Sequence, residues 1–158
     1  MPTIATKSNV KQATLPENWK KETTFYSGDD MINAYLQGKK RGKDEYMNDL
    51  AKIFKKNLNI ATTVSERLHE VALKKKINIK SIHLKADGVY KFTALFIADY
   101  NDFIDDKFKK IIREARKSKN ELINENFYIN FSFSPKSDSI SDKTLSTDGY
   151  FLKYDKAQ

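Results

Sequence analysis

Between residues 79 and 99, apolar and polar side chains alternate with a period of two, and one turn signal interrupts the alternation. Ile82 and Leu84 stand between polar neighbours, and the turn signal is Asp87-Gly88. The same period then returns in a second set of alternate apolar residues: Tyr90, Phe92, Ala94, Phe96 and Ala98. This pattern predicts a β-hairpin with one buried face.

The turn residues also predict how the two strands pair. A two-residue turn at Asp87-Gly88 would set Leu84 opposite Lys91 and mix the faces. A three-residue loop over residues 86–88 places Gly88 where a positive φ is needed. We therefore expect Leu84 opposite Tyr90 and Ile82 opposite Phe92.

The second face of this hairpin changes character along its length. It begins with polar and basic residues such as His83 and Lys91, and it ends with Leu95 and Ile97. Because a solvated face would stay polar throughout, we expect a cover over the apolar end: the long first helix, the N-terminal tail or a second subunit. The polar end, with Tyr128 nearby, has the composition of a platform for single-stranded nucleic acid, although an ordinary solvated sheet edge has it too.

Upstream of the hairpin the apolar period changes to that of a helix. Ser27 and the acids that follow it indicate a helix start. One apolar stripe continues across the polar insert 38–43, which predicts a single helix over residues 29–57. Its members are Ile32, Tyr35, Leu36, Tyr46, Met47, Leu50, Ile53 and Phe54. Lys39 and Lys43 lie on this stripe, so we expect the helix to overhang its own core there.

Two more helices are predicted further along. The capping box Thr63–Glu66 opens one that closes at three lysines, 74–76. Asp102 is the expected cap of the next, whose apolar positions run from Ile104 to Ile123 at helical spacing.

The last third of the chain returns to strands. Phe127, Ile129, Phe131 and Phe133 alternate with polar residues, and Pro135 ends this strand. A loop of 15 residues over 135–149 follows, and loops of that length are usually functional or disordered. Residues 150–154 form the final predicted strand.

These elements predict an α+β fold. From the second helix onward the order is α-β-β-α-β-β, a circular permutation of the ferredoxin-like order, preceded by the long helix. We expect a two-layer, four-stranded antiparallel sheet with helices on one face. The domains expected are an extended tail over 1–27 and one α+β domain over 28–158, with its sheet-and-helix part at 63–155.

Composition narrows the class of protein. The 158 residues include no cysteine, which excludes disulfides and thiolate sites. No stretch reads as a signal peptide or a membrane span, so we expect a cytoplasmic protein without membrane contact. The net charge of +8 comes mostly from Lys, which an AT-rich genome also favours, but the surplus is concentrated in residues 31–76.

No motif indicates catalysis. Residues 38–44 are one residue short of a P-loop and carry Asp44 where Ser or Thr should bind magnesium. His69 and His83 lack carboxylate partners at a metal-binding spacing. We therefore expect no enzyme, no cofactor, no metal and no small-molecule ligand.

Two classes of function remain open. The first is an assembly module that forms a homo-oligomer or joins a larger protein complex, with candidate contacts at Leu15, Trp19, Leu95 and Ile97. The alternative is a module that binds RNA or single-stranded DNA. Its candidate contacts are the basic residues Lys39, Lys40, Arg41, Lys43 and Lys91.

Overall fold

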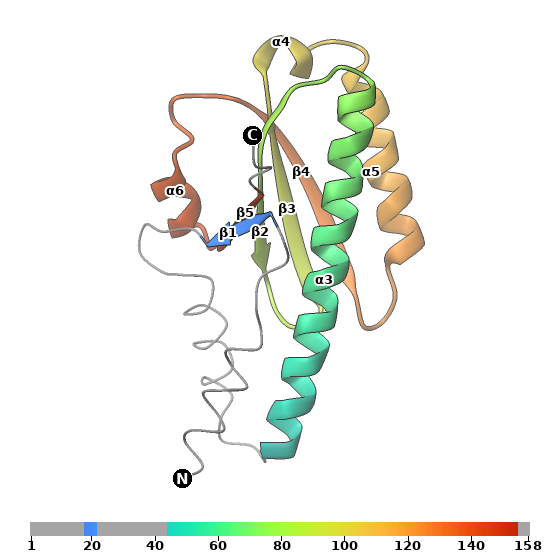
Figure 1. Ribbon diagram of the computed structural model, residues 1–158, viewed down its shortest axis with the longest axis vertical. Coiled ribbons are helices and arrows are strands. Elements are labelled where there is room, and N and C mark those ends of the chain that lie inside the picture. The colour runs from blue at the N-terminus through green and yellow to red at the C-terminus, as the bar shows by residue number, and fades with distance from the viewer. Residues whose placement is uncertain (1–17, 22–43, 155–158) are drawn as a thin grey trace.

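The computed structural model describes residues 18–21 and 44–154, which form one mixed five-stranded sheet with helices on both faces (Figure 1). The strand order is β1-β5-β2-β3-β4. The strands are β1 (Trp19–Lys21), β2 (Ile79–Ala86), β3 (Lys91–Ala98), β4 (Tyr128–Pro135) and β5 (Leu152–Tyr154). The helices are α3 (Asp44–Lys74), α4 (Tyr100–Phe103), α5 (Phe108–Leu122) and α6 (Asp142–Thr147).

Helix α3 is continuous where the sequence predicted two helices. It has 31 residues, about 46 Å at 1.5 Å per residue, and the expected break between residues 57 and 63 is wrong. The Thr63–Glu66 capping box lies inside the helix, because neither Gly nor Pro interrupts it and the apolar stripe continues through Leu58 and Ala61. Within this stretch the Ser65 hydroxyl donates to the Ala61 carbonyl at 2.8 Å, a side-chain bond to the preceding turn that is typical of a helix interior. Residues 29–43 of the predicted first helix lie outside the described residues.

The hairpin of β2 and β3 keeps the predicted faces and loses the predicted register. Ile82 pairs with Phe96 and Leu84 with Ala94, so each partner lies four positions from the expected one. Because the shift is even, the residues that pair in β2 and β3 keep their predicted faces, whereas Tyr90, which was expected on the buried face, does not. The turn covers residues 87–90 instead of 86–88, and Tyr90 is in it, 42 % exposed. The longer turn buries Val89, whose carbonyl accepts a hydrogen bond from the Asn57 side-chain amide at 3.0 Å.

Strand order corrects the predicted topology. The sheet has five strands instead of four, and β3 and β4 are parallel neighbours, so it is not wholly antiparallel. In the ferredoxin-like order a third strand separates two strands that are joined by a helix. Here β4 lies directly beside β3, and β5 pairs with β2 on the far side, so the permuted ferredoxin-like order is wrong. The connection between β4 and β5 spans residues 136–151, and this length allows the chain to pass from the β4 edge across the sheet to the far side of β2.

The main core lies between the sheet and helices α3 and α5, which run side by side in Figure 1. Phe92 and Phe96 of β3 are fully buried. The ring of Phe54 from α3 packs against Phe92, and the ring of Phe133 from β4 packs against Phe96.

The third predicted helix is split in two. Asp99 caps α4, and the side chain of Asp102, the expected cap, accepts a hydrogen bond from the Asn78 amide at 2.7 Å.

The predicted loop 135–149 contains helix α6, which packs on the opposite face of the sheet. Ser141 caps this helix through the Thr144 amide at 3.1 Å. Leu145 is buried in a small cluster with Ile97 and Tyr150, against which Leu95 also packs. The apolar half of the second face is therefore covered by the chain itself.

Among the described residues, no helix is long and apolar enough to span a membrane.

Candidate binding interface on strand β4

Strand β4 is one of the two edges of the sheet. The Tyr128 amide donates to the Tyr90 carbonyl at 2.7 Å, and the Lys136 amide donates to the Ala98 carbonyl at 2.8 Å. Along a parallel ladder the groups bonded to the neighbour alternate, so residues 128, 130, 132 and 134 face β3. The amide and carbonyl groups of Ile129, Phe131 and Phe133 point away from the sheet, and no other described strand pairs with them.

The residues of β4 themselves lack most of the features that usually protect an edge strand. The eight residues of β4 contain no charged side chain, and their pairing with β3 has no register shift. Pro135, which has no amide hydrogen, stands only at the last position. Natural edge strands are generally short, charged, bulged or interrupted by proline. Within β4, only the proline at its last position belongs to these protective features.

Two phenylalanines extend the main core to this edge. Phe131 and Phe133 are partly buried, and their rings lie 6.2 Å and 5.6 Å from the ring of Phe96. Phe133 also meets Phe108 of α5 edge-on at 5.6 Å. A strand added at β4 would cover the remaining apolar surface of both rings.

The face of β4 opposite the core carries an aromatic and basic cluster. Lys91 is the cross-strand neighbour of Tyr128, and its ammonium lies 5.5 Å from the centre of the ring. Lys119 reaches the same ring from α5 at 4.7 Å, and it donates to the Tyr128 hydroxyl at 3.0 Å and to the Asn130 side-chain oxygen at 3.5 Å. The hydrogen bond and the positive charge of Lys119, with a contribution from Lys91, lower the pKa of Tyr128 below 10. We call Lys91, Lys119, Tyr128 and Asn130 the Tyr128 cluster.

A second lysine–tyrosine pair lies on the same face, beside α6. The Lys85 ammonium is 4.9 Å from the centre of the Tyr150 ring. Burial, with the nearby charges of Asp148 and Asp87, raises the pKa of the Tyr150 hydroxyl above 10. Lys153 of β5 forms an ion pair with Asp142 at 3.5 Å, which ties α6 to the sheet. This part of the face is closed, whereas the part that contains the Tyr128 cluster is open.

The residues expected at an assembly contact lie in different surroundings. Ile97 is only 3 % exposed beneath α6, and Leu95 packs in the same cluster. Trp19 is buried in β1, where its indole nitrogen donates to a Glu66 carboxylate oxygen at 2.7 Å. Leu15 lies outside the described residues. The apolar end of the hairpin therefore no longer requires a second subunit as its cover.

The residues expected at a nucleic-acid contact are only partly described. Lys91 is exposed on the open face, next to Tyr128. Lys39, Lys40, Arg41 and Lys43 lie outside the described residues. Lys119 was not identified from the sequence, because a helical lysine that reaches around a sheet edge leaves no periodic signal. The sequence did contain one signal for the edge strand, because residues 128–135 include no charged side chain.

The two histidines are both buried. His83 is buried, and its Nε2 atom shares a hydrogen bond of 2.9 Å with the Ser81 hydroxyl. His69 lies on α3 with its ring 5.3 Å from that of Tyr154. Within the described ranges, no group of three or more His, Cys, Asp or Glu side chains is placed to hold a metal ion.

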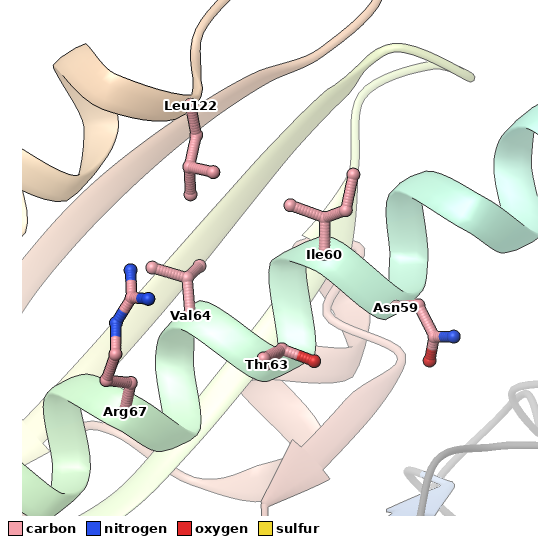
Figure 2. Close-up of a pocket in the computed structure, with 6 residues that line it drawn as sticks. All are labelled: Asn59, Ile60, Thr63, Val64, Arg67 and Leu122. Carbon is pink, nitrogen blue, oxygen red and sulfur yellow. The ribbon is translucent and has the colours of Figure 1, made fainter.

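A hollow of about 280 Å³ lies between α3 and α5 (Figure 2). Ile60 and Val64 of α3 and Leu122 of α5 point into it, and Arg67 extends along one side. Asn59 and Thr63 complete its lining. The hollow is smaller than most ligand sites, and its lining contains no acid–base pair or nucleophile arranged for catalysis.

Comparison of the chain with known proteins gives no further guide. No protein-family model, no curated protein and no solved structure matches it.

Proposed function

We propose that this protein is a non-enzymatic assembly module that pairs with a second copy of itself through the free edge of β4. The observation that carries the proposal is this edge, eight residues long, uncharged and unpaired within the described parts of the chain. An exposed row of amide and carbonyl groups is a template for strand addition. Phe131 and Phe133 therefore replace Leu95 and Ile97 as the candidate contact residues.

A second copy fits this edge in an antiparallel, two-fold arrangement. Two-fold pairing is self-complementary, since each strand offers the same alternate groups to the other. The outward groups of Ile129, Phe131 and Phe133 then bond to their counterparts. Because the partner's phenylalanines lie on the same side of the joined sheet, the cores covered by α5 in each copy become continuous. Burying partly exposed phenylalanine surface supplies the favourable free energy.

The direct test is the mass of the full chain in solution, measured by light scattering over a wide range of concentration. We expect the mass to approach twice that of one chain as the concentration rises. A mass that stays at one chain throughout would contradict the proposal.

Cysteine crosslinking tests the location of the contact. Because the chain has no native cysteine, Ser132→Cys introduces a single thiol on β4. If the two-fold axis passes through Ser132, the two thiols face each other and oxidation gives a crosslinked dimer. If the axis passes through Phe131, Asn130→Cys combined with Ser132→Cys crosslinks instead. Ser139→Cys, in the exposed connection before α6, is the matched control and should remain uncrosslinked.

A further inference from the structure

The open end of the second sheet face presents one aromatic ring with two ammonium groups close to it. Tyr128 lies at the start of β4, where the side chain of Asn124 accepts the Asn126 amide at 2.7 Å and shapes the turn before the strand. The ring thus sits at the corner of the sheet. Lys91 comes from the neighbouring strand and Lys119 from α5, so three separate elements converge on it.

The charge of this corner is unbalanced. Within residues 18–21 and 44–154, neither Lys91 nor Lys119 forms an ion pair with a carboxylate. Asp87 is the nearest acid along the hairpin, and its carboxylate accepts a hydrogen bond from the Thr93 hydroxyl at 3.0 Å. Lys85 of β2 lies in the row that contains Thr93 and Asn130, but its ammonium is directed to Tyr150 in the closed part of the face. The corner therefore has charge complementarity to an anionic ligand.

We propose that the Tyr128 cluster binds single-stranded nucleic acid, with one base stacked on the Tyr128 ring and the adjoining phosphates bound by Lys91 and Lys119. An ammonium that lies over the ring in the free protein moves to a phosphate when a base takes its place. Phosphates alone need no aromatic ring, and the acidic side chains of a peptide carry no aromatic face to stack on it, whereas every base has a face that stacks. The Asn130 amide can bond to a base edge.

The geometry also favours a single strand over a duplex. The bases of a duplex are stacked on one another and leave no face for Tyr128, whereas those of a single strand are accessible. Helix α6 closes the other half of the sheet face, so the platform is short and holds few nucleotides. This inference does not require self-association, because the Tyr128 ring lies on the face of β4, although the Lys119 side chain reaches that ring from α5 around the edge proposed for strand pairing.

The test measures binding of the full chain to fluorescently labelled oligouridine and oligothymidine by anisotropy, with a duplex of equal length and an abasic strand as comparisons. We expect both single strands to bind, and the duplex and the abasic strand to bind more weakly. Tyr128→Leu should weaken binding about 5- to 150-fold, the range for loss of one stacked base, whereas Tyr128→Phe should retain it.

Charge variants test the phosphate contacts. Lys119→Gln should reduce the slope of log affinity against log salt by about 0.7. Lys109→Gln is the matched control, because Lys109 lies on the same helix and pairs with Asp106 at 3.5 Å, away from the cluster. Equal affinity for single strand and duplex, or equal loss in Tyr128→Phe and Tyr128→Leu, would overturn the proposal. Light scattering of the same samples reports self-association separately, so failure of one proposal is distinguishable from failure of the other.

Discussion

Tyr128 and Tyr150 lie on the same sheet face, yet their surroundings shift their pKa values in opposite directions. Tyr128 stands at an open corner beside Lys119, which favours the phenolate and lowers its pKa. Tyr150 is buried beneath α6, which favours the neutral phenol and raises its pKa. The sequence placed Tyr128 near the polar end of this face, but it could not indicate a helix over Tyr150.

Burial of Tyr150 predicts a loss of stability at high pH. Its pKa is raised in the folded state, so its contribution is fully present below pH 10, where the phenol is neutral in both states. The contribution is lost as the pH rises from 10 through the folded pKa, because only the unfolded chain releases the proton freely. Urea unfolding at several pH values should show a steeper fall above pH 10 for the wild type than for Tyr150→Phe. Parallel curves for the two proteins would show that burial does not hold the proton.

At the scale of elements, β4 pairs with a neighbour along one edge and with no other described strand along the other. The amides of Tyr128, Asn130 and Ser132 bond to β3, whereas those of Ile129, Phe131 and Phe133 point outward. Amide hydrogen exchange followed by NMR should therefore show slow exchange at the even positions at all concentrations. The odd positions should exchange fast in dilute protein and slow as the concentration rises, since pairing protects them. Fast exchange at the odd positions even in concentrated protein would argue against an edge contact.

The elements also show which features of a fold a sequence can specify. Alternation determined the face of each residue of β2 and β3, because burial acts on every second side chain. Register depended on the turn, and the turn depended on Val89 reaching a core formed by α3, which no local rule contains. In the same way, Thr63–Glu66 has the residues of a capping box. The chain remained helical there because the apolar stripe continues on both sides.

At the scale of the whole molecule, the sheet joins segments from both ends of the described chain. β1 pairs with β5 alone, and Trp19 packs 5.4 Å from Tyr154 while its indole donates to Glu66 of α3. The sequence predicted a tail over residues 1–27 and proposed Leu15 and Trp19 as contacts. It could not show that residues 19–21 complete the sheet, since three residues carry no period and their partner strand lies more than a hundred positions away.

This arrangement predicts that β1 unfolds together with the rest of the domain. Trp19 is the single tryptophan, so its fluorescence reports β1 specifically. Urea transitions followed by Trp19 fluorescence and by helical circular dichroism should coincide, as for one cooperative unit. Trp19→Ala should lower the free energy of unfolding by about 3–5 kcal/mol, the usual range for a buried tryptophan. A fluorescence change that precedes the loss of helix would show that β1 opens separately.

The pairing of β1 with β5 also has a consequence for synthesis of the chain. A ribosome makes Trp19–Lys21 before every other described strand and makes Leu152–Tyr154 after all of them. β2 and β3 can pair, and β4 can join them, while β1 still has no partner. Contacts between distant segments form late because closing a long loop is entropically unfavourable. The strand that is translated first is therefore the last to be incorporated into the sheet, and the nascent chain carries an unpaired tryptophan until β5 arrives.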